Sequence, residues 1–362
     1  MAVAAQQGPM TLRKIADELG VSPSTVSRVL ATPGSEALRW GSADTVARIR
    51  AFAEQHGYSP NPQASSLRTR RSGLIGVLVP RLQDYVLATI YEGIEEAASE
   101  AGLSTFVTNS RDVTENQRAR TRMMIDRRVD GLIYGDAHLD HEFLDEVHEQ
   151  GIKFALVSRS AGNYPSATVD DHKGGWLVGQ HLAETGRRDV AILAGLEFTS
   201  TARLRSTGCV EALRANGIDV PPERIVYSGF DPAGGRAAIE QILAGGSVPD
   251  AIFATNDFAA IGAFGVLRDR GIHVPDDVAL VGYNDTPLAE GGAVPLTTIR
   301  SPMHEMGRCA VGLLLEVLAG RQPESVVLEP ELIVRGSSMA SGTNVVGSMG
   351  AGPARDSVPV PR

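Results

Sequence analysis

The chain has 362 residues, a net charge of −9, 43% hydrophobic residues and two cysteines. This length allows a small domain plus one large or two medium ones. Two cysteines supply neither a disulfide framework nor a set of zinc ligands, which is typical of a reducing cytoplasm. No apolar run approaches the ~20 residues that span a bilayer, and no signal-peptide pattern is present at the N-terminus. The sequence therefore predicts a cytoplasmic protein with no membrane partner.

Residues 11–30 contain two short helical patterns that meet at a glycine. Thr11 can cap the first, and Gly20 can end it in a left-handed conformation. The second has Ser22 as N-cap and Pro23 as its first residue. This spacing predicts a helix-turn-helix, whose second helix enters the major groove of DNA. An ordinary helical hairpin in a packed core is the alternative.

The second helix turns small hydroxyl groups and one arginine outward, away from its apolar face. Such groups suit the phosphates and base edges of DNA. The outward residues are Ser24, Thr25, Ser27 and Arg28.

A third helical pattern runs from Ser42, its N-cap, to His56. Residues 10–58 are thus predicted to form a small helical domain. Residues 59–72 contain prolines and arginines. They are either a basic linker or a hinge helix that forms on DNA, with Leu67 as an apolar wedge in the minor groove.

The segment from Thr11 to Ser72 resembles the DNA-binding headpiece and hinge of the LacI/GalR family of bacterial transcription regulators. The motifs T-L-R-K-I-A-D-E-L-G-V-S, T-V-S-R-V-L and Y-S-P-N-P-Q-A-S-S-L-R occur in the family's order and spacing. The resemblance implies that Ser24 and Arg28 read bases and that Leu67 intercalates. The positions implied to contact phosphates or to cap the helix are Ser22, Thr25 and Ser27.

Three features depart from the family pattern. Residues 31–41, between the second and third helices, are more numerous than usual. Pro23 stands where many relatives carry a base-reading side chain, and Ser65 stands where a basic residue is frequent. The operator sequence therefore cannot be transferred from a relative.

Charge is divided unevenly along the chain. From Met10 to Arg71, nine basic and five acidic residues give a net charge of +4, which leaves −13 for the remaining residues. A basic headpiece on an acidic body is consistent with phosphate binding at one end.

From residue 73 onward the pattern alternates between apolar strands and amphipathic helices. The strands are predicted at 74–79, 104–108, 131–134, 154–157, 190–193, 251–254 and 278–282. The helices are predicted at 89–101, 116–127, 174–185, 206–216 and 258–270. This alternation predicts an α/β domain over residues 73–340, with two lobes of doubly wound parallel sheet. The glycine pairs at 234–235 and 245–246 are interpreted as loops.

This body resembles the family's sensor domain, which has the periplasmic-binding-protein fold, most clearly at A-I-F-A-T-N-D (251–257) and V-G-Y-N-D-T-P-L (281–288). A ligand is expected in the cleft between the lobes, beyond the carboxyl ends of the strands. The resemblance also implies a homodimer. Residues 1–9 and 341–362 are predicted to be disordered, and the latter contain no leucine heptad for a tetramer.

Polar candidates for the effector site follow the predicted strands. By family position Arg205 reaches the ligand, Asn256 is a ligand contact, and Asn284 replaces an aspartate of sugar-binding relatives. Asp257 is expected to cap the next helix, and Asp285 is either a ligand contact or a turn or cap residue. The full set of candidates is Tyr85, Ser158, Arg159, Arg205, Asn256, Asn284 and Asp285.

These observations predict a DNA-binding transcriptional regulator, a repressor acting as a homodimer on a pseudo-palindromic operator in the nucleoid. Amides, carboxylates and arginines favour a neutral, hydroxyl-rich effector, a small carbohydrate. A corepressor-dependent regulator that senses a purine or another metabolite is the alternative. An enzyme is disfavoured because no nucleotide-binding or nucleophile motif occurs, so no catalytic residue, cofactor or metal is expected. A transport solute-binding protein is disfavoured by the helix-turn-helix and the missing secretion signal.

Overall fold

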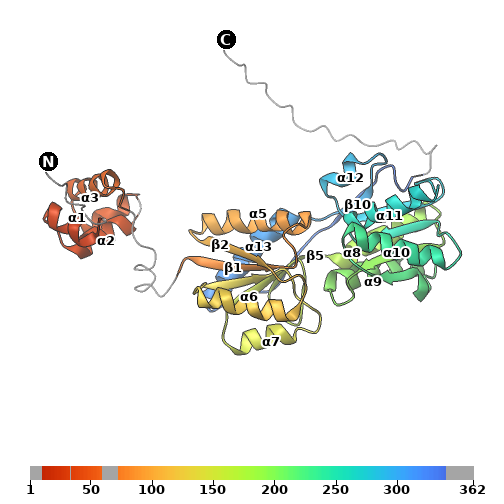
Figure 1. Cartoon of the computed structure of the whole chain (residues 1–362), viewed down its shortest axis with the longest axis horizontal. Coiled ribbons are helices and arrows are strands. Elements are labelled where there is room, and N and C mark those ends of the chain that lie inside the picture. Colours follow the sequence, from red (N-terminus) through yellow and green to blue (C-terminus); the bar gives the residue numbers. More distant parts are fainter. Residues whose placement is uncertain (1–9, 33, 59–71, 340–362) are drawn as a thin grey trace, which may run out of the picture.

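The computed structural model describes residues 10–32, 34–58 and 72–339. It contains a helical headpiece and two α/β lobes (Figure 1). The predicted terminal segments 1–9 and 341–362 lie outside the described residues. So does nearly all of the predicted hinge, including Leu67.

The headpiece is a cluster of short helices around one apolar core. Its elements are α1 (Leu12–Leu19), α2 (Pro23–Ala31), the 3-10 helix η1 (Gly34–Trp40) and α3 (Ala43–Gln55). The predicted caps are confirmed: Thr11, Ser22 and Ser42 each accept the backbone N–H of the third residue along. Gly20 ends α1 with a φ of 67°. The helix η1 lies in the long segment between α2 and α3 and was not predicted.

The first lobe contains a six-stranded parallel sheet in the order β11-β5-β4-β3-β1-β2. Its strands are β1 (Leu74–Val79), β2 (Ser104–Asn109), β3 (Gly131–Tyr134), β4 (Phe154–Val157), β5 (Ser166–Val169) and β11 (Val326–Leu328). Its helices are α5 (Tyr85–Glu100), α6 (Thr114–Asp126), α7 (Glu142–Glu149) and α13 (Met303–Leu318). Apolar residues of α5 and α13 share one core cluster with the sheet, and those of α6 and α7 share another.

The second lobe repeats this plan in the order β12-β10-β9-β8-β6-β7, with only the β10–β12 pair antiparallel among its described strands. Its strands are β6 (Val190–Gly195), β7 (Ile225–Tyr227), β8 (Ala251–Ala254), β9 (Ala279–Asn284), β10 (Thr297–Arg300) and β12 (Glu331–Ile333). Its helices are α8 (Asp171–Glu184), α9 (Ser200–Ala215), η2 (Pro222–Arg224), α10 (Pro232–Ala244), α11 (Asp257–Asp269) and α12 (Pro287–Gly291). The prediction of two doubly wound lobes is confirmed.

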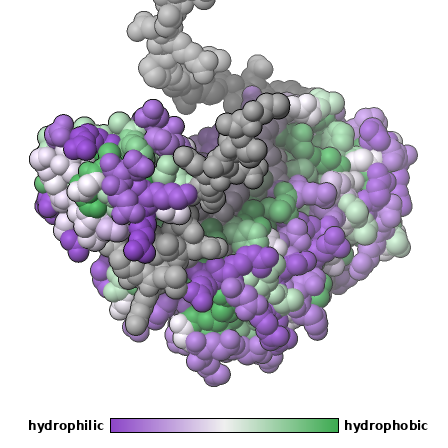
Figure 2. All heavy atoms as spheres, turned by 60° about the vertical axis from the view of Figure 1, so that its left-hand side comes forward, coloured by the Kyte–Doolittle hydropathy of each residue, from purple (hydrophilic) through white to green (hydrophobic). Residues whose placement is uncertain are grey.

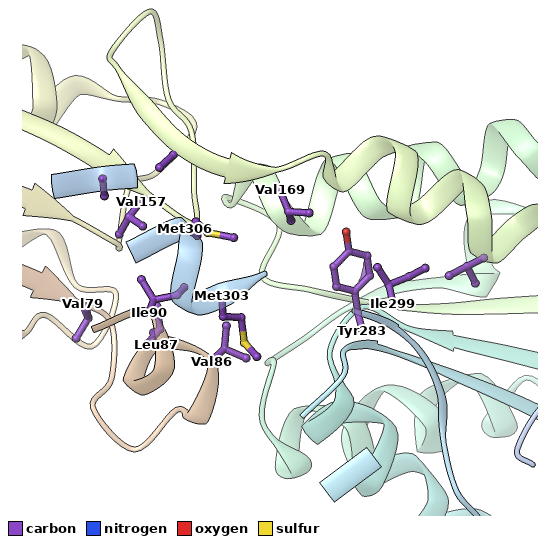
Figure 3. Packing of buried hydrophobic residues seen from close by; sticks show 14 of the residues in the cluster. Val79, Val86, Leu87, Ile90, Val157, Val169, Tyr283, Ile299, Met303 and Met306 are labelled. Carbon is purple, nitrogen blue, oxygen red and sulfur yellow. The ribbon is translucent and has the colours of Figure 1, made fainter. Parts of the chain in front are cut away.

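The two lobes are joined by three crossings of the chain, from β5 to α8, from β10 to α13 and from β11 to β12. One apolar cluster continues from lobe to lobe at these crossings. Figure 3 shows Met303 and Val86 of the first lobe on one side of the junction, and Tyr283 of the second lobe on the other. The two lobes therefore share part of their apolar core at the junction.

One sequence interpretation is wrong: the glycine pair at 234–235 lies inside α10 rather than in a loop. A Cβ atom on Gly235 would lie 2.0 Å from the carbonyl oxygen of Ala259 in α11. Glycine is needed there because the two helix backbones touch. In α8, a Cβ on Gly175 would likewise lie 2.0 Å from the carbonyl oxygen of Arg205 in α9.

Hydrophilic residues cover most of the face seen in Figure 2, and hydrophobic residues form separate patches between them. None of the helices in the described ranges combines the length and apolar character needed to span a membrane.

Candidate functional site

The N-terminal end of α2 presents a group of hydroxyl side chains at the headpiece surface. The Oγ of Ser22 accepts the N–H of Thr25 at 3.1 Å and lies 2.8 Å from the hydroxyls of both Ser24 and Thr25. Ser24 and Arg28 are exposed, and Thr25 and Ser27 are half-buried. Helix N-termini attract phosphate through free N–H groups and the helix dipole. This surface therefore combines a helix N-terminus, exposed hydroxyl groups and an exposed arginine.

A cleft opens where the carboxyl ends of the two sheets meet. Its outer cavity has a volume of about 600 Å³. The residues lining this outer cavity are Pro80, Arg81, Gln83, Asp84, Arg111, Asp112, Arg159, Leu196, Phe198, Gly229, Phe230, Asp231, Pro232 and Phe258. A volume in this range accommodates a small-molecule ligand.

A smaller cavity of about 40 Å³, called the inner recess below, adjoins the outer cavity and shares Pro80, Asp84, Arg159 and Phe230 with it. Its lining residues are Pro80, Asp84, Val86, Leu87, Ser158, Arg159, Thr201, Arg205, Phe230, Asn256 and Asn284. Five predicted effector-site residues are therefore brought together in the recess: Ser158, Arg159, Arg205, Asn256 and Asn284.

Arg205 is held rigidly at the recess. Its Nε donates to Asp171 Oδ1 at 2.7 Å, and its Nη1 donates to the carbonyl of Thr255, also at 2.7 Å. Its guanidinium carbon lies 3.7 Å from the ring centroid of Tyr283. Burial raises the pKa of the Asp171 carboxyl, and the charge of Arg205 opposes that rise. The pair is thus a buried, mutually neutralising unit at the floor of the cleft.

Arg159 is neutralised in a similar way within the first lobe. Its two terminal nitrogens donate to the two carboxylate oxygens of Asp112 at 2.6 and 3.2 Å. Nearby, Asp84 caps α5 by accepting the N–H of Val86. Burial raises the pKa of Asp84, and that N–H and the charge of Arg159 oppose the rise. The first-lobe wall therefore presents both acceptors and donors.

Two asparagines supply the second-lobe wall. Asn256 caps α11, because its Oδ1 accepts the N–H of Phe258 at 2.8 Å. The sequence predicts Asp257 as the cap of this helix, and that prediction is wrong. Asn284 is 2% exposed with a φ of 108°, and its Nδ2 has no hydrogen-bond partner among the residues the structure describes. A buried donor without a partner is costly, and a ligand acceptor in the recess would satisfy it.

Comparison with known proteins agrees with this geometry. The model of the family "Bacterial regulatory proteins, lacI family" matches residues 11–61, and that of a "Periplasmic binding protein-like domain" matches residues 180–338. The transcriptional repressor PurR of Pectobacterium atrosepticum is 30% identical over 338 residues, which cover 92% of this chain and 97% of that relative. The chain belongs to the lacI family of bacterial regulatory proteins.

Two solved structures superpose on nearly the whole chain. The lac repressor dimer bound to operator and the anti-inducer ONPF is 28% identical with a TM-score of 0.81, covering 92% of this chain and 100% of that one. The regulator CelR in complex with cellobiose is 30% identical with a TM-score of 0.70, covering 91% and 100%. This lacI-family protein is therefore a DNA-binding transcriptional repressor and not an enzyme.

Two predicted effector residues of the repressor line neither the outer cavity nor the inner recess. Tyr85 is the first residue of α5, and 41% of it is exposed. The Asp285 carboxylate accepts from Arg335 at 2.7 Å and from Arg300 at 2.8 Å. These ion pairs hold Asp285 in a structural role.

Three phenylalanines of the repressor's cleft were not predicted. Phe198, Phe230 and Phe258 follow β6, β7 and β8, and all line the outer cavity. Each lies beyond the carboxyl end of a parallel strand, the position used to choose the polar candidates. Phe230 lines the inner recess as well. The same rule applied to apolar residues would have found Phe198 and Phe258, because the strands before them were predicted. It would have missed Phe230, because strand β7 was not predicted.

Proposed function

We propose that this repressor senses a neutral, hydroxyl-rich ligand, a small carbohydrate, bound between its lobes. The observation that carries the proposal is the charge state of the cleft. Arg159 is paired with Asp112, Arg205 with Asp171, and Arg81 lies 3.9 Å from Asp231.

These pairs leave little uncompensated positive charge for an anion. A phosphate or carboxylate would meet arginines whose charge is already balanced, and displacing a protein carboxylate from a buried pair costs several kcal/mol. Arg111, the remaining arginine of the outer cavity, is exposed. A neutral ligand can hydrogen-bond without breaking the pairs.

The remaining lining supports a sugar. The unpartnered Nδ2 of Asn284 calls for an acceptor, which a hydroxyl supplies. Asp84 offers the opposite function, an acceptor for hydroxyl donors. The faces of Phe198, Phe230 and Phe258 offer apolar surface for the C–H side of a sugar ring.

A purine is the second candidate. Relatives that are 29–30% identical to this chain are repressors named PurR. A flat heteroaromatic ring can stack on the same phenylalanines, and its ring nitrogens can accept from Asn284.

The test is calorimetric titration of the full-length protein with cellobiose, lactose, a glucose phosphate, guanine and hypoxanthine. Asn284→Ala is the site variant, and Tyr85→Ala is the matched control, because Tyr85 lies outside both cavities. We expect a neutral sugar to bind, about 2- to 10-fold more weakly to Asn284→Ala and equally well to Tyr85→Ala. Binding of the glucose phosphate alone, or of a purine alone, overturns the carbohydrate proposal.

We also propose that the protein acts as a homodimer whose two headpieces bind the half-sites of a pseudo-palindromic operator. Ser24 and Arg28 would read bases, and Ser22, Thr25 and Ser27 would contact phosphates. Closure of the lobes on the effector would shift operator affinity, and a coupling of about 1–3 kcal/mol changes it about 5- to 150-fold. Sedimentation velocity of the free protein tests the dimer, since a monomer at assay concentration contradicts it. Operator titrations with and without effector give the sign of the response.

A further inference from the structure

The helix η1, between α2 and α3, packs against the rest of the headpiece. Ala37, in the middle of η1, is fully buried in the headpiece core. Arg50 of α3 donates from Nη2 to the carbonyl oxygens of Thr32 at 2.8 Å and Gly34 at 3.1 Å. These contacts attach η1 to the adjoining helices, so that the residue at its end has a defined position.

That residue, Trp40, packs against the recognition helix. The guanidinium carbon of Arg28 lies 4.5 Å from the centroid of the Trp40 ring. Both side chains are exposed, with Trp40 at 40%. An arginine over the face of a tryptophan is attracted by the ring quadrupole, and tryptophan is the strongest aromatic partner.

The position of Arg28 over the Trp40 ring is compatible with base reading. A guanidinium that lies flat on an aromatic ring uses its face for the contact, whereas its N–H groups lie in the plane and stay free. That in-plane edge is the part that pairs with O6 and N7 of guanine in the major groove. The stack also restricts a long, flexible side chain before DNA binds, so less conformational entropy is lost on binding.

We infer that Trp40 is a positioning residue for base recognition, holding the guanidinium of Arg28 ready to read a guanine. It thereby raises the preference for guanine at the base pair that Arg28 contacts. The inference rests on the proposed base contact of Arg28, and the experiment separates the two.

The experiment selects operators for the full-length protein from a library of randomised DNA duplexes. Affinities of each variant are then measured for the selected duplex, for duplexes with single base-pair changes, and for an unrelated duplex. Arg28→Ala removes the reading group, Trp40→Ala removes the ring, and Trp40→Phe keeps an aromatic face. Leu38→Ala is the matched control, because Leu38 is an exposed apolar residue (51%) of the same 3-10 helix.

We expect Arg28→Ala to abolish discrimination at one base pair in each half-site. Trp40→Ala should reduce discrimination at that same base pair by about 2- to 5-fold. Discrimination at the other base pairs and affinity for the unrelated duplex should stay unchanged. Trp40→Phe should keep most of the discrimination, and Leu38→Ala should behave as the wild type.

Three results would overturn the inference. If Arg28→Ala loses discrimination and Trp40→Ala keeps it in full, Trp40 does not position Arg28, while the base contact stands. If Arg28→Ala alters no base preference, the base contact itself is wrong. If Trp40→Ala weakens every duplex by the same factor, Trp40 acts through the fold of the headpiece rather than through Arg28.

Discussion

Asp171 is expected to be essential for the inner recess because it neutralises Arg205. The side chains of Asp171 and Arg205 are only 2% and 6% exposed, and water screens them little. In Asp171→Asn the guanidinium would keep only neutral partners, the carbonyl of Thr255 and the ring of Tyr283.

The cost can be estimated from this burial. Removing one partner of a buried ion pair costs about 3–5 kcal/mol. Asparagine retains one acceptor oxygen, so we expect the lower end, about 3 kcal/mol. For a large domain each kcal/mol lowers Tm by about 2–4 °C, which gives a decrease of about 6–12 °C. Thermal unfolding of the full-length protein at neutral pH measures it.

Lys173→Gln is the matched control on the same helix. Lys173 pairs with Glu329, but these side chains are 48% and 75% exposed. An exposed pair is worth less than about 1 kcal/mol, so the control should barely change Tm. If the Tm of Asp171→Asn falls no more than that of this control, Asp171 is not needed to neutralise the charge of Arg205. Arg205 would then be available to an anion, and the argument for a neutral effector would fail with it.

Three further predictions concern stability. Burial raises the pKa of Asp136 from 3.8 to about 6, so the folded state binds this proton more tightly and stability falls as pH rises from about 4 to about 6. The wild type should lose about 3 kcal/mol of unfolding free energy across that window, and Asp136→Asn should not. Urea unfolding at several pH values tests this, and the same pH profile in both proteins would contradict it. Gly175→Ala should destabilise the sensor by at least about 1–3 kcal/mol by forcing α8 and α9 apart. Gly312→Ala, in α13 with open space around it, is the control and should instead stabilise the protein by about 0.5–1 kcal/mol. Equal melting temperatures of the two variants would refute the close contact between α8 and α9 at Gly175. Ser22→Ala should cost the headpiece about 1 kcal/mol and speed hydrogen exchange in α2, and unchanged exchange would show that the cap contributes nothing.

The parts of the fold that follow from local pattern were predictable. Strands β1, β3, β4 and β8 have the predicted bounds because short apolar runs between helices are typical of buried parallel strands. Helix α10 was missed because two adjacent glycines usually indicate a loop. Glycine is required at position 235 because the backbone of α10 touches that of α11 there. The sequence of α10 alone does not reveal this contact.

The candidate site shows the same limit at the level of single residues. Asp84 lines both cavities and caps α5, whereas the adjacent Tyr85 is exposed. Asn284 lines the recess, whereas Asp285 turns to Arg335. Strand ends identify the correct edge of the sheet. Which of two consecutive side chains enters the cleft depends on the local turn and on distant partners.

The three crossings between the lobes have a consequence for how the protein is made. Neither lobe is a continuous stretch of chain, because the first lobe needs α13 and β11, which come after nearly all of the second. Until the ribosome has passed residues 303–328, the face of α5 that carries Ile90 and Ile94 lacks its partner helix α13. Such apolar faces promote aggregation of nascent chains. The first-lobe wall of the cleft is therefore completed late in synthesis, after nearly all of the second lobe.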